Sequence, residues 1–286
     1  MPAAHKDIVI LYHGGCPDGF GSAYAAWKKY GDAADYIPVR YQQPLTQNLE
    51  GKEIYMIDFC YDQVQMNELL KMAKSLTVLD HHEGIQAVVE SMPNHVYDTS
   101  RSGASIAWGY FHPTTPLPTF LKYVEDVDLF RMIPEEERAL MRYAYAQVWH
   151  FDIWDAHVRN TDDPVERARM IERGTVYQEY FKLLSKQLAN GAELVEFEGY
   201  TCHIVNGVRM FITDLGAELV KQRPPISLVV RAGASGLRVS IRSDGSVNAA
   251  ELAQRHGGGG HPGSAAFSLP WGAPIPWIAL QANPEN

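Results

Sequence analysis

The chain has 286 residues, of which 46% are hydrophobic and 21% charged, so its composition is that of a globular protein and excludes a disordered or fibrous one. The formal net charge of -9 argues against the broad basic surface that holds duplex nucleic acid by its phosphates. No apolar run approaches the length of a membrane span, the first residues lack a signal segment, and three cysteines fit a reducing compartment. We therefore expect a cytoplasmic protein that binds neither duplex DNA nor membranes, and a homo-oligomer is compatible with the sequence.

Strands and helices alternate in the N-terminal part. An apolar run at 7–11 leads through a glycine-rich turn into a helical pattern at 20–30. Two further apolar runs, 54–57 and 76–79, flank a helical segment near 63–74. Alternation of this kind predicts an α/β domain with a parallel sheet.

Polar residues stand where each of these three predicted strands ends. They are His13 and Asp18 after the first strand, Asp58 after the second, and Asp80, His81 and His82 after the third. Because the carboxyl ends of parallel strands share one edge of a sheet, we expect these side chains to converge. A carboxylate that bridges two divalent cations is a standard way to hold the oxygens of an in-line phosphoryl displacement, and Asp58 is placed for the bridge. Alone, it would equally suit a helix cap.

The adjacent histidines of the triplet point in different directions. One of them can therefore bind a metal while the other faces a substrate, and Asp80 can fix an imidazole tautomer from behind. The alternative is a turn in which one histidine is buried and hydrogen-bonded.

The hydrophobic pattern of the sequence changes after Gly191. Before it, 120–187 is helical and charged and is predicted to be a connector; after it, short alternating runs predict a second domain. The expected elements there are strands at 200–205, 226–231, 237–242 and 264–269 and a helix at 248–256. We place the first domain and its connector at 1–185 and the second domain at 195–286.

Three segments are candidate anion sites. Four glycines before His261 allow a backbone to approach a ligand closely, although one of them would be needed simply to end a helix. Hydroxyls, helix amides and Arg101 make a second candidate at 100–105, where plain N-capping by Ser102 is equally plausible. Period two puts Arg238 and Arg242 on one strand face, where one of them can reach a phosphate, although solvation is the expected fate of most arginines. The predicted substrate-binding residues are Arg101, Ser102, Gly258, Gly259, Gly260 and His261.

These segments resemble the DHH phosphoesterase superfamily, which is named for a triplet like that at 80–82 and whose second domain ends in a glycine-rich loop and a histidine like 257–261. The resemblance covers nearly the whole chain. It implies an N-terminal parallel-sheet DHH domain with flanking helices, a helical connector and a smaller C-terminal mixed α/β domain of the DHHA1 type, with the substrate in the cleft between them. It also implies a manganese-dependent hydrolase of phosphoesters or phosphoanhydrides, with two ions.

The resemblance assigns roles by position in the family's motifs. The implied metal ligands are His13, Asp18, Asp58, His81 and Asp126, and the implied catalytic residues are His82, Asp80 and Asp58, with His82 on the scissile phosphate. Asp126 matches the last ligand better than Asp128 because Phe130 follows it four residues later, as in relatives. Without the family, this segment would be interpreted as an acidic helix end facing solvent.

Cys16 departs from the family pattern. Family members commonly carry two Asp separated by one residue in the first motif, whereas this chain has Cys16-Pro17-Asp18. A thiolate ligand would shift the metal preference from manganese towards zinc or iron. Alternatively, Cys16 does not ligate and the first site is weak, empty or filled only with substrate; of the two, we favour non-ligation.

The sequence therefore predicts a metal-dependent phosphoesterase that acts on a phosphodiester or phosphomonoester in a small nucleotide, such as a short oligonucleotide, a dinucleotide or a nucleoside bisphosphate. A pyrophosphatase or exopolyphosphatase is the alternative, because it needs the same metals but no surface for base stacking. A nucleotide-binding protein with catalysis weakened by Cys16 is a third possibility. Aromatic residues lining the second domain's cleft would favour nucleotides.

Overall fold

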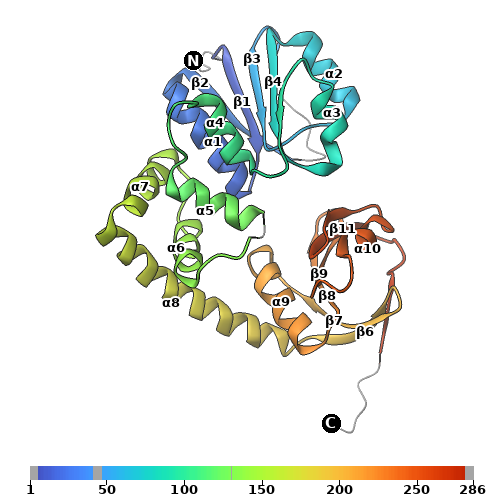
Figure 1. Cartoon of the computed structure of the whole chain (residues 1–286). Coiled ribbons are helices and arrows are strands. Elements are labelled where there is room, and N and C mark those ends of the chain that lie inside the picture. The colour runs from blue at the N-terminus through green and yellow to red at the C-terminus, as the bar shows by residue number, and fades with distance from the viewer. Residues whose placement is uncertain (1–5, 41–46, 130, 281–286) are drawn as a thin grey trace. The chain divides into compact units, whose positions relative to one another are not determined.

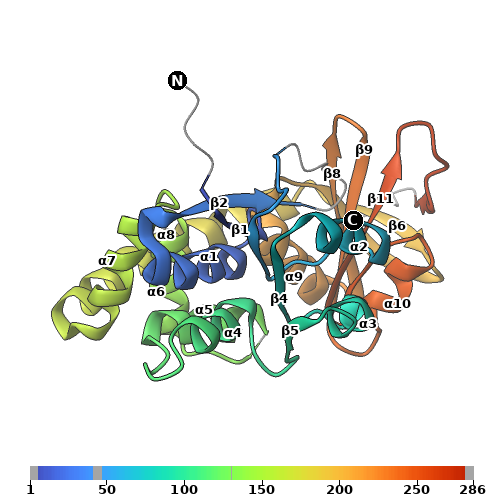
Figure 2. The ribbon, with the colours of Figure 1, turned by 90° about the horizontal axis from the view of Figure 1, so that it is seen from above.

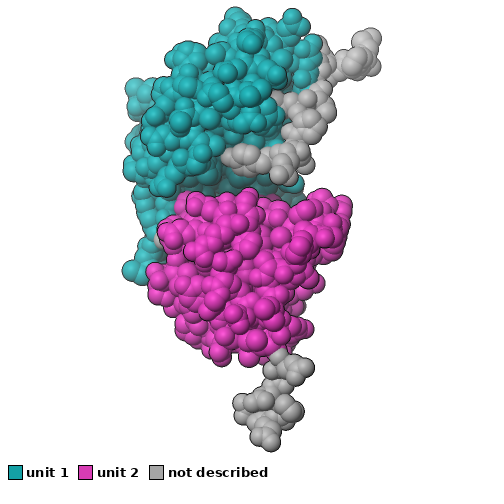
Figure 3. Space-filling model, turned by 90° about the vertical axis from the view of Figure 1, so that its right-hand side faces the viewer, with its two compact units in different colours: residues 1–177 teal, residues 178–286 magenta. Residues whose placement is uncertain are grey.

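The computed structural model describes residues 6–40, 47–129 and 131–280. The chain divides into two compact units, Met1–Tyr177 and Gln178–Asn286 (Figure 3). The division falls within helix α8 (Pro164–Ala189), whereas the sequence placed the change of domain between 185 and 195. No helix in the described ranges is long and apolar enough to cross a membrane.

Unit 1 is built on a five-stranded sheet in which all neighbouring strands are parallel, in the order β2-β1-β3-β4-β5. The strands are β1 (Ile8–His13), β2 (Ala34–Val39), β3 (Glu53–Ile57), β4 (Ser75–Asp80) and β5 (Asn94–Tyr97). The predicted parallel sheet is confirmed. The edge strand β2 contains Pro38 and was not predicted from the sequence, because proline weakens a strand pattern and is confined to such edges.

The central strands of this sheet are buried on both faces, as is usual for parallel strands covered by helices. Ile10 and Leu79 belong to the hydrophobic core on one face, with α1 (Pro17–Tyr30) and α4 (Gly103–Phe111). Leu11, Met56 and Val78 belong to the core on the other face, with α2 (Gln63–Met72) and α3 (Gln86–Glu90). Figures 1 and 2 show α1 and α4 on one side of the sheet and α2 and α3 on the other. This sandwich holds the carboxyl ends of β1, β3 and β4 in fixed register.

Four helices complete this part of the chain: α5 (Thr119–Asp128), α6 (Glu135–Tyr145), α7 (Phe151–Asp162) and α8. The helix α7 is amphipathic. It buries Trp154 and His157 and leaves His150, just before its first residue, exposed. His157 is therefore a core residue of this helical layer.

We expect unit 1 to lose stability as the pH falls from about 6.5 towards 4. Burial lowers the pKa of His157 from 6.5 to about 4, so the unfolded chain binds this proton first. The contribution of the neutral imidazole to the free energy of unfolding is therefore fully present above pH 6.5 and is lost as the pH falls towards 4. Chemical denaturation across this range should show a smaller loss in His157→Gln than in the exposed control His150→Gln. Equal losses in the two variants would contradict the assignment.

Unit 2 is a seven-stranded mixed sheet in the order β10-β11-β9-β8-β7-β6-β12, in which only β7 and β8 are parallel neighbours among the described strands. Its strands are β6 (Glu193–Phe197), β7 (Tyr200–Asn206), β8 (Ile226–Gly233), β9 (Gly236–Ser243), β10 (Gly259–His261), β11 (Ser264–Pro270) and β12 (Trp277–Ala279). The helix α10 (Ala249–Gln254) packs with Phe197 and Phe267, and α9 (Ile212–Gln222) packs with Val229. The predicted mixed α/β class is confirmed.

Candidate active site

The ends of three neighbouring strands of unit 1 bring carboxylates and imidazoles together. Strand β1 ends on His13, β3 is followed by Asp58, and β4 ends on Asp80 and leads into His81 and His82. The potential ligand atoms form three sets, and within each set they lie within 4.8 Å of one another. The sets are His13, Cys16 and Asp58; Asp18, His81 and Asp128; and Asp58, Asp80, His81 and His82.

Asp58 stands between the first two sets. Its Oδ2 lies 3.3 Å from His13 Nδ1, and its Oδ1 lies 3.2 Å from His81 Nε2, so each oxygen faces a different set. Burial alone would raise the pKa of Asp58, but the interactions with the imidazoles of His13 and His81 outweigh it and hold that pKa below its ordinary value. The backbone at Asp58 has a φ of 58°, in the left-handed region that Asp tolerates better than most residues and that occurs often at functional sites.

Asp18 is held by the first turn of α4. Its carboxylate accepts hydrogen bonds from the backbone N–H groups of Gly103 at 2.6 Å and Ala104 at 3.0 Å. Its Oδ2 also lies 3.7 Å from His81 Nε2. Burial and the charge of Asp58 raise the pKa of Asp18 well above its ordinary value, because two carboxylates this deep repel each other. A contact between residues 85 apart in sequence thus places this carboxylate at the sheet edge.

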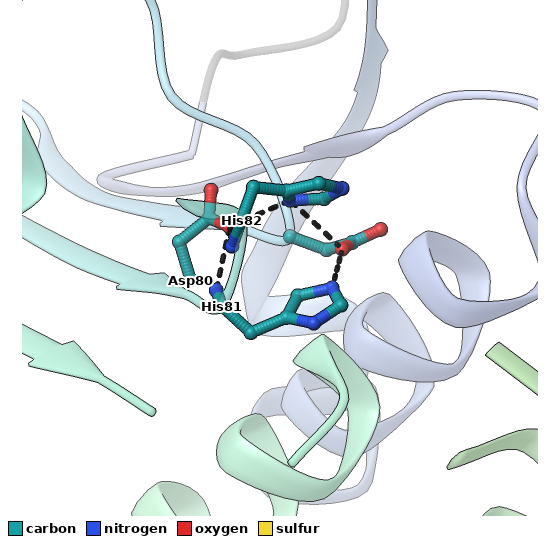
Figure 4. Close-up of side chains that lie close together, drawn as sticks. Asp80, His81 and His82 are labelled. Atoms are coloured by element: carbon teal, nitrogen blue, oxygen red, sulfur yellow. Dashed lines mark hydrogen bonds and ion pairs between the residues drawn. The ribbon is translucent and has the colours of Figure 1, made fainter. Parts of the chain in front are cut away.

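The triplet at 80–82 is organised by its aspartate (Figure 4). Asp80 Oδ1 accepts hydrogen bonds from the backbone N–H of His81 at 2.6 Å and of His82 at 3.0 Å, and lies 2.8 Å from His82 Nδ1. Burial lowers the pKa of His82, but the hydrogen bond with Asp80 and the charge of Asp58 raise it to about 9. The side chain of His82 is 36% exposed and that of His81 only 7%, so His82 is the histidine of the triplet that a ligand can reach.

Cys16 lies where the first motif turns into α1. Its Sγ is within 4.8 Å of ligand atoms of His13 and Asp58. Burial and the charges of Asp58, Asp18 and Asp128 raise the pKa of the thiol well above its ordinary value. The structure therefore places Cys16 in the cluster. We expected from the sequence that Cys16 is not a ligand, and that expectation did not require it to lie there.

The structure does not bring Asp126 to this cluster. Its carboxylate is engaged by Lys122 at 2.5 Å and by Arg131 at 3.0 Å. Asp128, the alternative in the same helix, has its Oδ2 3.6 Å from His81 Nε2, and burial and Asp58 raise its pKa to about 6. Residues two apart on a helix do not share a face, so only one of the two can point at the strand ends. Phe130, on which the choice of Asp126 depended, lies outside the described residues.

The predicted anion site at 100–105 is not formed. The first amides of α4 are taken by Asp18, and Ser102 caps the helix by accepting a hydrogen bond from the backbone N–H of Ser105. The guanidinium of Arg101 folds back and donates to the carbonyl of Ser105. The N-capping alternative describes this segment correctly, because a carboxylate of the chain itself satisfies the helix terminus.

Tyr145 of α6 had no signal in the sequence. Its hydroxyl is buried, and burial with the charges of Cys16, Asp128 and Asp18 raises its pKa. The phenol therefore lies close to Cys16, Asp18 and Asp128. No periodicity or spacing could have shown this, because α6 is more than a hundred residues away from β1.

The residues of the cluster fit divalent cations. The charges of Asp58 and Asp128 raise the pKa of Asp18, and the charge of Asp58 raises the pKa of Asp128. A bound cation would offset this repulsion between carboxylates. Carboxylates and imidazoles are the ligands that manganese, iron and zinc accept. His13, Cys16 and Asp58 could hold one ion, and Asp18, His81 and Asp128, with the other oxygen of Asp58, could hold a second.

Unit 2 carries a cavity of about 470 Å³ with a strongly basic lining. Arg231 of β8 pairs directly with Arg238 of β9, and Arg238 lies two positions before Ser240 and four before Arg242 on the same strand. Like charges opposite each other destabilise a sheet unless an anion compensates them. The lining is Arg209, Ile212, Thr213, Arg231, Arg238, Ser240, Arg242, Gly259, Gly260, Ser264, Ala265 and Ala266.

The glycine run is only partly at this cavity. Gly259 and Gly260 line it, whereas Gly258 and His261 are not among its lining residues. A Cβ on Gly258 would lie 2.2 Å from the carbonyl oxygen of Ala266, and Gly260 has a φ of 144°. Gly258 and Gly260 are therefore required by the close approach of this segment to β11, and residues 259–261 form a short strand where a loop was expected.

Part of unit 2 is similar to a known domain family. Residues 211–274 match the DHHA1 domain family. A curated relative, an uncharacterized protein of Acanthamoeba polyphaga mimivirus, is 29% identical over 290 residues, which are 91% of this chain and 67% of the relative.

Two solved structures resemble the whole chain. One is the DHH domain of a member of the s1p family of ribosomal proteins, with a TM-score of 0.63, 11% identity and coverage of 92% of this chain and 82% of that one. The other is an exopolyphosphatase-related protein from Bacteroides fragilis, with a TM-score of 0.50, 12% identity and coverage of 92% and 87%. At such identities, the likeness shows a shared fold.

Proposed function

We propose that the chain, of which residues 211–274 match the DHHA1 domain family, is a DHH-superfamily protein and a metal-dependent phosphoesterase that hydrolyses a phosphodiester or phosphomonoester in a small nucleotide. The observation that carries this proposal is the placement of Asp58, whose two oxygens face His13 on one side and His81 on the other. A carboxylate in that position suits the bridge between two cations, for which the family's usual metal is manganese.

The side chains of unit 1 have distinct tasks in this proposal. Divalent cations bound there supply positive charge for the phosphoryl oxygens and increase the acidity of water. Asp80 fixes the orientation of His82 through its Nδ1, and the exposed side of His82 donates to a phosphoryl oxygen. Asp58 stays ionised because His13 and His81 hold its pKa low.

The cavity of unit 2 supports a phosphate-rich substrate. Among the described residues, Arg231, Arg238 and Arg242 form no ion pair with a carboxylate, so their charge is available to an anion. The lining contains no aromatic side chain on which a base could stack. The arginines suit a substrate with more than one phosphate, such as a nucleoside bisphosphate, and the described lining has no stacking platform for a long oligonucleotide.

The absence of an aromatic lining in the described cavity also supports a second candidate function, hydrolysis of pyrophosphate or polyphosphate. Such a substrate needs the same metals and an arginine-rich cavity but no platform for a base.

A hydrolysis screen with added manganese separates these functions. It covers dinucleotides, short oligonucleotides, nucleoside bisphosphates, pyrophosphate and polyphosphate, with Asp58→Ala as the inactive control. Turnover of a nucleotide that depends on Asp58 supports the proposal, and turnover of pyrophosphate or polyphosphate alone supports the second candidate. Tight nucleotide binding with no turnover that depends on Asp58 would identify a binding protein and contradict both.

Arg238→Ala is expected to raise KM for the active substrate by about 10- to 100-fold, because a hydrogen bond to a charged group contributes about 1.5–3 kcal/mol. The value of kcat should change much less, since this arginine holds the substrate in the ground state and the transition state alike. Steady-state kinetics beside Arg223→Ala, which lies in the same unit outside the cavity lining, measures the effect. An unchanged KM in Arg238→Ala would show that the cavity does not bind the substrate.

A further inference from the structure

We propose that the metal centre is asymmetric, with a thiolate position formed by His13, Cys16 and Asp58 that selects zinc or cobalt and a second position formed by Asp18, His81 and Asp128 that accepts manganese. This inference rests on the proposed metal-dependent function and adds the identity of the metals. It assigns Cys16 as a ligand.

The first step is the geometry of the turn after β1. Gly15, with a φ of 77°, lets the chain reverse between His13 and the start of α1, so that Cys16 follows His13 by only three residues. A nitrogen of His13, the sulfur of Cys16 and an oxygen of Asp58 then lie within 4.8 Å of one another. These are three donors from two adjacent strand ends, converging on one point.

The second step is the difference between the two positions. The set of Asp18, His81 and Asp128 offers two carboxylates and one imidazole, which are hard and intermediate donors suited to manganese. The set of His13, Cys16 and Asp58 replaces one carboxylate with a sulfur, a soft donor that favours zinc and cobalt over manganese. The thiol proton passes to solvent when the bond between sulfur and metal forms.

The third step is the contrast with the other two cysteines. Cys60 and Cys202 are fully buried in hydrophobic clusters, and neither belongs to a set of potential ligands within the described residues. Cys202 lies in unit 2 and is a control with the same side chain outside the described ligand sets.

Titration of the metal-stripped protein with cobalt tests the proposal, because cobalt bound to a thiolate has a near-ultraviolet charge-transfer band that carboxylate and imidazole ligands do not produce. We expect this band in the wild type and in Cys202→Ser, and its loss in Cys16→Ser and Cys16→Asp. Bound cobalt is measured in parallel by elemental analysis, so that the band is referred to metal content. Circular dichroism confirms that each variant is folded.

Competition between zinc and manganese gives a second readout. The wild type is expected to retain both metals after removal of free ions. In Cys16→Asp, the preference for zinc over manganese should fall by at least about 10-fold, because losing even a residue that only supports a metal ligand lowers metal affinity by about 10- to 100-fold. The same substitution should increase hydrolysis supported by manganese alone.

Each other outcome overturns the proposal in a recognisable way. Bound cobalt without a charge-transfer band, together with hydrolysis that depends on Asp58, would show that Cys16 is not a ligand. The proposed function would still be supported. A band that persists in Cys16→Ser would assign the thiolate to another cysteine. Failure of the folded protein to bind cobalt at all would overturn both the asymmetric centre and the metal-dependent function.

Discussion

Asp58→Asn is expected to lower kcat/KM by at least about 1,000-fold, because bound metal ions contribute several kcal/mol to the transition state and each 1.36 kcal/mol is a factor of ten in rate. The wild-type carboxylate presents one oxygen towards His13 and the other towards His81. Asparagine keeps one oxygen and replaces the other with an NH₂ group, which cannot bind a cation. One of the two metal positions therefore loses its shared ligand.

Asparagine is the sharper substitution at this position because of the backbone. The φ of 58° at Asp58 is tolerated by Asn nearly as well as by Asp, whereas Ala is strained there. We therefore expect Asp58→Asn to fold with a free energy of unfolding close to that of the wild type, and Asp58→Ala to be less stable. The comparison separates loss of a ligand from loss of structure.

Asp62→Asn is the matched control. Asp62 is exposed, lies four residues later and caps α2 by accepting a hydrogen bond from the backbone N–H of Gln65 at 2.9 Å. Asn caps a helix as well as Asp does, so this variant should keep full activity and stability. Substantial hydrolysis by Asp58→Asn, with metal content equal to that of Asp62→Asn, would show that Asp58 is not the shared ligand.

The convergence of His13, Asp58 and the triplet could be predicted from the sequence because it depends on a local rule. Each residue directly follows a short apolar run, and parallel strands place their carboxyl ends at one edge. The pattern needs no knowledge of which helices cover the sheet. A second local rule, the alternation of side chains along a strand, placed Arg238 and Arg242 on one strand face, and both line the cavity of unit 2.

The parts of the site that the sequence analysis did not predict depend on contacts between distant segments. Nothing near Gly103 indicates that its amide would be taken by Asp18, so the first turn of α4 resembled an open anion site. The choice between Asp126 and Asp128 depended on the rotation of α5 about its axis, which is set by the packing of its buried residues Phe120, Leu121 and Val124 against the rest of unit 1. A family match over a short motif cannot resolve a shift of two residues on a helix.

Gly103→Ala is expected to reduce kcat/KM by about 100-fold, because a displacement of about 1 Å at a reacting centre can have an effect of this size. A Cβ at this position would lie 2.5 Å from the Cβ of Asp58 and 2.9 Å from Oδ2 of Asp18. Neither carboxylate can retreat easily: Asp58 is buried with its backbone in the left-handed region, and Asp18 is held by two amides of α4. The methyl group must therefore push apart the residues that we assign to the metal centre.

Gly109→Ala in the same helix separates this effect from a general change in α4. The atoms nearest to its Cβ would be those of the guanidinium of Arg101, at 3.2 Å, which is the end of a flexible side chain that can move. We expect Gly109→Ala to retain activity, and Gly103→Ala to lose both activity and metal affinity, with a cost of about 1–3 kcal/mol in the free energy of unfolding from overpacking. Kinetics, metal content and denaturation of the two variants measure these quantities side by side. If Gly103→Ala bound metal and hydrolysed substrate as well as Gly109→Ala, the carboxylates it displaces would not be the ones that hold the metals.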